Sequence, residues 1–321
     1  MLNILGKRYL YFLLSLLVIV PGMVVMAIYG LPLAVDFKGG SLLEVQFSTE
    51  TIPTVEQVVE IYNQYGFEEV SVQTAEGTTG IRNILVIRSP DLATTIDGKE
   101  VNADAMKNIL VADLREVAND PNAEVNTFSN VGPSIAQQVT QRAGLAVALA
   151  ALAVVIYIYF VFRGIPHSLR YGICAVLAML HDILVVLSLT AIGGRLFGWQ
   201  VDSLFLTALL TVIGFSTQDK IVVFDRIREN TSFLRKLPFE KLVNHSIVQT
   251  LQRSINTQLM TVEFMLLALA LFGGVTLREF AVILLVGLFS GTYSSIFIAA
   301  PLLVVWENQE WKTWFRRTAT A

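Results

Sequence analysis

Length, composition and charge place this chain among membrane proteins. Of its 321 residues, 54% are hydrophobic and only 15% are charged, and the mean hydropathy of +0.61 lies above the range of soluble globular domains. The net charge is −3, and no basic stripe or tail stands free of the apolar segments, which argues against nucleic acid as a partner. The one cysteine, Cys174, lies in an apolar run, so the sequence indicates no internal disulfide and no metal or redox site.

Six apolar segments are long enough to cross a bilayer, which takes about 20 mainly apolar residues. They are residues 9–28, 143–162, 169–192, 201–224, 255–272 and 280–305. The first segment is longer than the apolar core of a cleaved signal peptide, so we expect it to remain as the first span. The sequence therefore predicts a polytopic α-helical membrane protein with six transmembrane helices.

The distribution of Lys and Arg predicts the orientation of these spans. Most of these residues lie at the termini and in one set of loops, whereas the short loops opposite hold only Arg195 and Arg278. Because positive charge accumulates in cytoplasmic loops, we expect a multi-pass protein of the cytoplasmic (inner) membrane with both termini cytoplasmic. The expected divisions are residues 1–34 (N-terminus and first span), 35–141 (external domain), 142–306 (five spans, with a cytoplasmic loop at 225–250) and 307–321 (cytoplasmic tail).

The expected extracytoplasmic domain lies between the first two spans. Residues 41–47 alternate like a strand, and residues 54–66 carry apolar positions at helical spacing before a glycine. Patterns for two strands, a helix and a last strand follow, which gives the order βαββαβ. This order is typical of a ferredoxin-like α+β sandwich. The domain has no paired catalytic carboxylates, histidine cluster or glycine-rich phosphate loop, so we expect a binding role and no enzyme activity.

Five sequence segments, spread over nearly the whole chain, occur together in the order and spacing of a known family. They are VDFKGGSLLEVQF (35–47), SNVGPSIAQQV (129–139), AMLHDILVVLS (178–188), TVIGFSTQDKIVVFDRIREN (211–230) and LQRSINTQLMT (251–261). Together they resemble the SecF family, whose members partner SecD beside the bacterial Sec protein-export channel. The resemblance implies membership of the resistance-nodulation-division superfamily of proton-driven transporters.

The resemblance also implies a function and a set of partners. With SecD, the chain would use the proton motive force to promote the translocation and release of polypeptides across the cytoplasmic membrane. The implied partners are SecD, the SecYEG channel and the translocating polypeptide, with YidC and YajC as further candidates. The proton is the coupling ion, and no other cofactor is implied.

Asp219 stands out among the acids because it lies inside an apolar segment, where an unpaired carboxylate is costly. At 1.5 Å per residue it sits about 10 Å inside the end of its helix, and Arg253 sits about 12 Å inside an antiparallel neighbour, so the two have similar depths. The resemblance implies an intramembrane acid at Asp219 and a conducting arginine at Arg253. From the residues alone, Arg253 could instead be an anchor that snorkels to the interface, and Asp219 a passive packing group.

Further polar residues lie at membrane depth. Asp182, with His181, is either part of the proton path, part of a seam with SecD, or a hydrogen-bonding link between helices. Glu263 is either an added relay group or the partner of Lys220. Lys220 directly follows Asp219, and because one helical step turns it to another face, we expect it to snorkel. The supporting polar residues are Gln218, Thr257 and Thr261.

Small residues indicate joints and close helix packing. Gly39 and Gly40 provide a turn or a hinge where the external domain begins, and the return joint contains Gly132 and Pro133. The last span repeats small residues at every fourth position, which permits close helix packing. These residues are Gly287, Gly291 and Ser295.

Two other functions fit the residues. The chain could be half of a proton-driven small-molecule exporter, although its external domain is small and an internal repeat is absent. It could also be a passive scaffold of the Sec channel that binds emerging polypeptide and needs no proton. Replacing Asp219 by asparagine separates the scaffold from the motor, because a scaffold would keep working.

Overall fold

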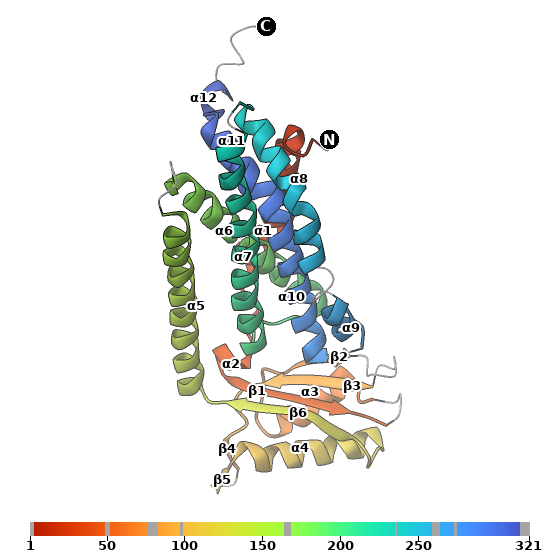
Figure 1. Ribbon diagram of the computed structural model, residues 1–321. Coiled ribbons are helices and arrows are strands. Elements are labelled where there is room, and N and C mark those ends of the chain that lie inside the picture. The colour runs from red at the N-terminus through yellow and green to blue at the C-terminus, as the bar shows by residue number, and fades with distance from the viewer. Residues whose placement is uncertain are drawn as a thin grey trace.

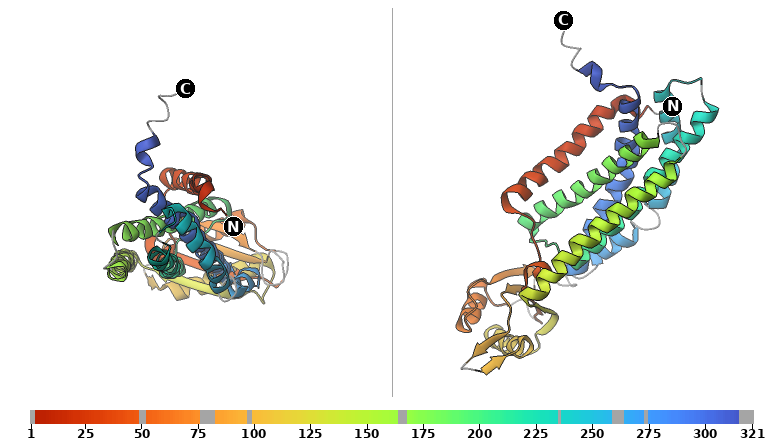
Figure 2. Two further views of the ribbon diagram at one scale, coloured as in Figure 1. Left: turned by 45° about the horizontal axis from the view of Figure 1, so that its top comes forward. Right: turned by 90° about the vertical axis from the view of Figure 1, so that its left-hand side faces the viewer.

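The computed structural model describes residues 3–48, 52–75, 83–96, 99–163, 168–234, 236–258, 264–272 and 275–314. Long helices run from a small antiparallel sheet at one end of the molecule to the two chain ends at the other (Figure 1). Two further views show the same division into a helical bundle and a sheet domain (Figure 2). The molecule therefore separates a helical part from a mixed α/β part along its long axis.

The bundle begins with a short 3-10 turn and contains several helices of twenty residues or more. Its elements are η1 (Leu5–Lys7), α1 (Arg8–Tyr29), α5 (Pro133–Phe162), α6 (Ser168–Phe197), α7 (Ser203–Phe233), α8 (Phe239–Gln258), α9 (Phe264–Phe272), α10 (Val275–Ser294), the π-helical turn η3 (Ser295–Ala299), α11 (Ala300–Glu307) and α12 (Trp311–Trp314). Local signals begin two of the longest helices, since Pro133 occupies the first turn of α5 and the Asp202 carboxylate accepts the Phe205 N–H of α7 at 2.7 Å.

Within the described residues, five helical stretches are long and apolar enough to cross a membrane. They are Leu5–Tyr29, Pro133–Phe162, Ser168–Phe197, Ser203–Phe233 and Leu277–Glu307. The last runs through α10, η3 and α11 without interruption. The sequence predicts a sixth span at 255–272, but residues 259–263 of it lie outside the described part of the chain, and α8 and α9 flank them. The structure thus shows a multi-span helical protein and leaves the sixth span a prediction.

Two boundaries differ from the expectation. The segment 225–250 is helical over most of its length, because α7 continues to Phe233 and α8 begins at Phe239. The expected external domain ends at 141, but α5 begins at Pro133 of the expected return joint and continues without a break into the expected second span. Polar residues extend a helix beyond its apolar part without a change of backbone, so hydropathy alone does not mark where such a helix begins or ends.

The sheet domain lies between α1 and α5 along the chain. Its elements are α2 (Val35–Lys38), β1 (Gly40–Gln46), α3 (Val55–Gln64), β2 (Ser71–Ala75), β3 (Ile84–Ser89), β4 (Thr94–Ile96), β5 (Lys99–Val101), α4 (Ala103–Ala118) and β6 (Glu124–Val131). The main sheet has the order β2-β3-β1-β6 and all its pairs are antiparallel, while β4 and β5 form a separate hairpin that the sequence pattern did not predict. Thr54 starts α3 with a capping box to Gln57.

Alternation along the central strands gives the sheet two different faces. Leu43 and Val45 of β1 and Ile87 of β3 pack with α3 and α4 into one buried apolar core. The intervening residues Glu44 and Arg88 point to the other face, which lines a cavity against the bundle. One face therefore stabilises the domain, and the other faces the helices.

The joint between α1 and the sheet is held by several contacts. Ala34 N–H donates to the Val201 carbonyl at 2.9 Å, and Val201 N–H donates to the Pro32 carbonyl at 2.7 Å. The Asp36 carboxylate accepts the Ser203 hydroxyl at 2.6 Å. Gly40 has a φ of +117°, and a Cβ there would lie 2.6 Å from the Ser89 carbonyl oxygen, so only glycine fits.

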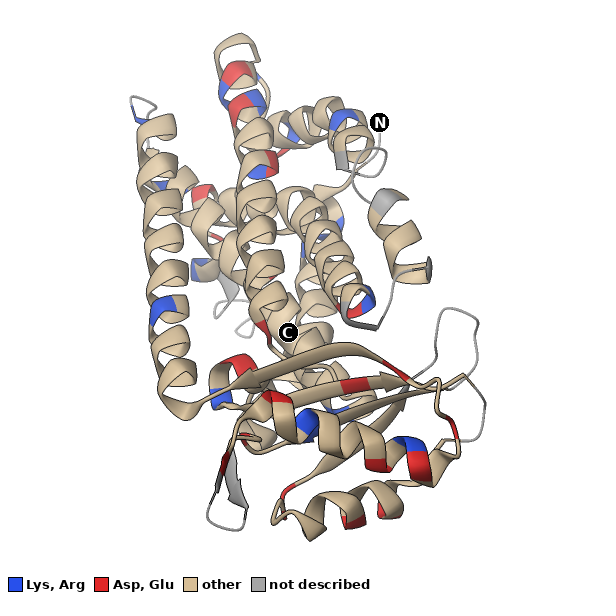
Figure 3. Cartoon of the chain, turned by 90° about the horizontal axis from the view of Figure 1, so that it is seen from below, with Lys and Arg blue, Asp and Glu red and all other residues tan. Residues whose placement is uncertain are grey.

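Charged residues are distributed unevenly between the helical bundle and the sheet domain. Seen from the sheet end, the helices are mostly uncharged along their lengths, and charged residues are more frequent on the sheet domain (Figure 3).

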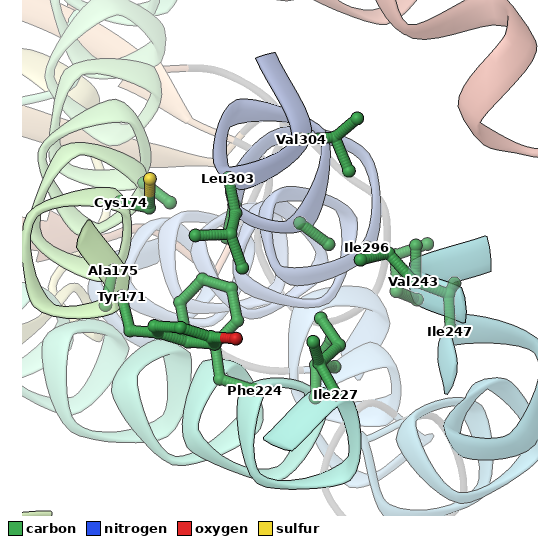
Figure 4. Close-up of a cluster of buried hydrophobic side chains, with 14 of the residues drawn as sticks. Tyr171, Cys174, Ala175, Phe224, Ile227, Val243, Ile247, Ile296, Leu303 and Val304 are labelled. Atoms are coloured by element: carbon green, nitrogen blue, oxygen red, sulfur yellow. The ribbon is translucent and has the colours of Figure 1, made fainter. Parts of the chain in front are cut away.

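At the end away from the sheet, an apolar cluster joins α6, α7, α8 and the last span, and it includes Tyr171, Phe224, Val243 and Leu303 (Figure 4). This cluster fixes the helices on one side of the polar groups described below.

Gly22 allows α1 to pack against α6. A Cβ at Gly22 would lie 2.4 Å from the Ser188 Cα, which is backbone and cannot turn away. Gly22→Ala is therefore expected to destabilise the bundle by about 1–3 kcal/mol, the usual cost of overpacking. The thermal unfolding midpoint of the purified protein in detergent measures this effect. Gly144→Ala is the matched control, because a Cβ there meets nothing within 4 Å, and an equal loss in both variants would contradict the prediction.

Candidate functional site

Asp219 is a buried acid on α7, with 7% of its surface exposed. Its carboxylate accepts two hydroxyl hydrogen bonds, one from each neighbouring element. Ser254 of α8 donates to Oδ1 at 2.7 Å, and Ser295, the first residue of η3, donates to Oδ2. Both donors are neutral, and among the residues that the structure describes no cation pairs with this carboxylate.

A small cavity of about 60 Å³ lies against Asp219. Arg253 of α8 lines the same cavity as Asp219. The volume is enough for water, which needs polar partners in a space of this kind. The remaining lining residues are Phe215, Gln218, Val222, Thr257 and Leu288. The cavity thus brings the acid and the arginine of the sequence prediction to one site with both polar and apolar lining residues.

Asp182 of α6 forms a second buried polar centre, with only 1% of its surface exposed. Lys220 of α7, which is fully buried, donates to its Oδ2 at 2.7 Å. The expectation that Lys220 snorkels to the interface is therefore wrong. The reason is that one helical step turns Lys220 away from Asp219 and toward α6, where a carboxylate neutralises its charge.

Three serine hydroxyls complete the shell of Asp182. Ser216 of α7 donates to Oδ2 at 2.5 Å, Ser294 of α10 donates to Oδ2 at 2.7 Å, and Ser290 of α10 donates to Oδ1 at 2.7 Å. Ser216 also accepts from the Lys220 ammonium. The carboxylate is therefore bonded by groups from two other helices, which ties α6, α7 and α10 together.

His181 extends this centre to α1. Its Nδ1 lies 3.1 Å from Asp182 Oδ1, and its Nε2 lies 2.8 Å from the Ser15 hydroxyl. The ring stacks on Tyr293 with centroids 6.2 Å apart, and the Tyr293 hydroxyl donates to the Tyr11 carbonyl at 2.9 Å. A chain of polar groups therefore runs from α1 through α6 to α7 and α10.

Glycines of α10 make these short contacts possible. A Cβ at Gly287 would lie 2.2 Å from a methyl group of Val212, and a Cβ at Gly291 would lie 3.1 Å from the Ser216 Cβ. The absence of these Cβ atoms lets α10 approach α7 closely. Ser290 and Ser294 of α10 can then reach Asp182, and Ser295 of η3 can reach Asp219. Ser295, which the sequence suggests as a packing residue, also donates directly to Asp219.

Several residues of the sequence prediction lie at or near this site, and others cannot be placed. Gln218 and Thr257 line the cavity beside Asp219, whereas Glu263 and Thr261 lie outside the described residues. Gly132 caps the start of α5, and Gly39 has a φ of +82°. Sequence reasoning missed the serines that contact the acids, although a serine cluster within the last apolar span was a signal. The missed serines are Ser216 of α7, Ser254 of α8, and Ser290 and Ser294 of the last span.

A larger cavity of about 1010 Å³ separates the sheet from the ends of α6 and α10 and from the segment 198–202 that follows α6. Glu44 and Arg88 line it from the sheet, and Trp199 and Glu279 line it from the bundle. Arg88 donates to the Gln73 side chain at 2.9 Å. Burial lowers the pKa of Arg88, while the carboxylates of Glu279 and Glu44 oppose this shift. The cavity is thus a polar junction between the sheet domain and the bundle.

Fold and site together define a multi-span membrane protein with a sheet domain at one end and buried acids between its helices. Comparison with known proteins gives the family. The profile of "Protein export membrane protein SecD/SecF, C-terminal" matches residues 111–309, and that of the "SecD/SecF GG Motif" matches residues 24–51. The chain therefore belongs to the SecF family of protein translocase subunits, as the following relatives also show.

Three relatives represent the similarity. The protein translocase subunit SecF of Anaerolinea thermophila is 61% identical over 319 residues, which cover 99% of this chain and 98% of the relative. The protein translocase subunit SecDF of Bacillus subtilis is 32% identical over 96% of this chain and 38% of its own length. The crystal structure of SecDF from Thermus thermophilus, a translocon-associated membrane protein, superposes with a TM-score of 0.77 at 30% identity, over 96% of this chain and 39% of that one. This chain therefore spans less than half the length of the SecDF proteins.

Proposed function

We propose that this chain works with SecD as a proton-driven subunit of the Sec protein-export machinery, and that Asp219 carries the proton. The observation that carries the proposal is the placement of Asp219, which is buried, accepts hydrogen bonds from two neutral hydroxyls and is adjacent to a cavity that Arg253 also lines. An ionisable group inside a membrane span is expensive and marks ion pathways. Membership of a translocase family supplies the process that proton entry would drive.

The surroundings of Asp219 suit both of its protonation states. Hydroxyl groups can donate to a carboxylate and can also accept from a protonated carboxyl group, so Ser254 and Ser295 can bond to either form. A proton could therefore enter from the cavity and leave again without stranding a buried polar group.

The proposed arrangement in the membrane follows from the positive-inside rule and from the relatives. The chain would lie in the cytoplasmic membrane with both termini cytoplasmic and the sheet domain on the outer side. SecD is the proposed partner, because relatives named SecDF carry a match to this chain within a longer protein. The SecYEG channel is the proposed neighbour, with YidC and YajC as further candidates.

The sheet domain is the proposed contact for exported polypeptide. Its order of β1, α3, β2, β3, α4 and β6, with the β4–β5 hairpin added, suggests a ferredoxin-like domain. In the described sheet, β2 and β6 are edge strands. Edge strands can bind an extended peptide through main-chain hydrogen bonds, with little dependence on its sequence. Binding of this kind suits a subunit of an export machinery that handles many different polypeptides.

The experiment that tests the proposal measures polypeptide translocation in vesicles that contain this chain, SecD and the channel. A proton gradient is imposed and then collapsed with a protonophore. We expect collapse to lower translocation in these vesicles and to have a much smaller effect in vesicles that lack this chain. An equal effect in both kinds of vesicle would indicate a passive scaffold.

A further inference from the structure

We propose that Asp182 and Lys220 form a permanently ionised pair that positions the Asp219 site and does not itself carry the proton. The inference deepens the proposed function and rests on the role given there to Asp219. Two adjacent residues of α7, Asp219 and Lys220, then have opposite tasks. One exchanges a proton with its cavity, and the other holds a fixed charge in the interior.

The bonding of Asp182 differs from that of Asp219 in kind. Asp182 contacts a cation directly, at 2.7 Å, and receives three hydroxyl hydrogen bonds, so both of its oxygens are occupied. Donors around a carboxylate favour its ionised form, and an adjacent ammonium adds to this. Asp219 has two neutral donors and a cavity beside it. Both oxygens of Asp182 are occupied and a cation contacts one of them. We therefore expect this carboxylate to stay ionised while Asp219 takes up the proton.

The pair is also linked mechanically to the Asp219 site. Ser294, the last residue of α10, donates to Asp182, and the next residue, Ser295, donates to Asp219. The backbone changes from α-helix to π-helix between them, and π-helical turns are often found at functional sites. A fixed charge pair that holds Ser294 therefore fixes the position from which Ser295 reaches the second acid.

In the described part of the chain, charged and titratable groups of α6, α7, α8 and α10 lie near the pair. His181 lies beside Asp182 on α6, Tyr293 of α10 stacks on His181, and Asp219 precedes Lys220 on α7. Arg253 of α8 lines the small cavity beside Asp219. Asp182 and Lys220 neutralise each other, so the intact pair adds no net charge to the surroundings of Asp219.

Charge-pair variants test the proposal. Removing one member of a buried ion pair strands the other charge, whereas removing both leaves none. We therefore expect Lys220→Met and Asp182→Asn, taken singly, to lose most co-purification with SecD, and the double variant Asp182→Asn/Lys220→Met to regain it. Thr217→Val is the matched control, because this buried hydroxyl on α7 donates only to its own helix at Ile213 and should assemble like the wild type.

A pH profile distinguishes a positioning pair from a proton carrier. In the double variant, the asparagine at position 182 can still accept the Ser294 hydroxyl, so Ser294 stays held without a stranded charge. We therefore expect gradient-dependent translocation to continue with its pH midpoint unchanged, because no proton-exchanging group is lost. In whatever Asp182→Asn protein assembles, the stranded ammonium beside Asp219 should move the midpoint to lower pH by about one unit or more. Loss of gradient-dependent translocation in an assembled double variant would overturn the proposal and make the pair part of the proton path.

Two further outcomes would contradict the proposal. A double variant that fails to assemble would contradict the proposal, since stranded charge is the stated cause of failure in the single variants. Single variants that assemble with a wild-type midpoint would contradict it as well. The co-purification result needs no transport, so it judges the pair even if Asp219 proves not to carry the proton. Failure of the proposed proton transfer at Asp219 can therefore be told apart from failure of the proposal about the Asp182–Lys220 pair.

Discussion

Replacing Asp219 with asparagine is expected to abolish the part of translocation that depends on the proton gradient, while assembly with SecD is retained. Asparagine keeps the size of the side chain. Its amide oxygen can accept from one of the two hydroxyls, Ser254 or Ser295, and its NH2 group can donate to the other, but it cannot take up a proton. The measurement is translocation into vesicles with and without an imposed gradient, normalised to the amount of assembled complex. The gradient-independent part should stay at the wild-type level.

The control for this variant is Asp225→Asn. Asp225 lies on the same helix less than two turns away, but its side chain is 54% exposed and it pairs with Arg228 within the helix. Exposed pairs of this kind contribute little, so the variant should translocate like the wild type. Unchanged gradient dependence in Asp219→Asn would shift the proton to another acid or indicate a scaffold without proton use.

Replacing Arg253 with methionine is expected to reduce gradient-dependent translocation by about tenfold or more. Arg253 lines the cavity beside Asp219, so its loss removes a positive charge from the site where the proton would enter and should favour the protonated form of the acid in the variant. The pH midpoint of translocation should move upward accordingly. The measurement is the pH profile of gradient-dependent translocation in vesicles that contain the variant and SecD.

Two further variants separate this role from that of a membrane anchor. Arg253→Lys keeps the positive charge and should recover a substantial part of the activity, with a midpoint near that of the wild type. Arg226→Met removes an arginine of α7 that pairs with Glu229 and should have little effect on the profile. If Arg253→Met lowers the amount of membrane-inserted protein but leaves the pH profile unchanged, Arg253 is an interfacial anchor.

The architecture of the chain was largely predictable because its signals are long and repetitive. The apolar runs at 143–162 and 169–192 fall within helices of the structure, and the alternation at 41–47 falls on β1, apart from its last residue. The β4–β5 hairpin was missed because its strands have three residues each, which is too short for a periodic pattern. Helix ends were misplaced wherever polar residues continued a helix.

The site was only partly predictable, since depth along a helix can be read from a sequence more easily than direction around it. Asp219 and Arg253 have similar depths, and they line one cavity. The partner of Lys220 was not predicted, because it depends on which neighbouring helix its face meets. The serines around Asp182 come from two helices that are distant in sequence, so only the packing of α10 against α7 reveals the cluster.

The most direct test of the central claim is whether Asp219 takes up a proton in the assembled complex. Infrared spectroscopy of the complex with SecD, recorded as the pH is lowered, follows the band of protonated carboxyl groups in wild type, in Asp219→Asn and in Asp182→Asn/Lys220→Met. The account predicts a titrating band that is missing in Asp219→Asn and present in the double variant. A band that survives in Asp219→Asn and disappears in the double variant would contradict it, because the proton would then bind at Asp182.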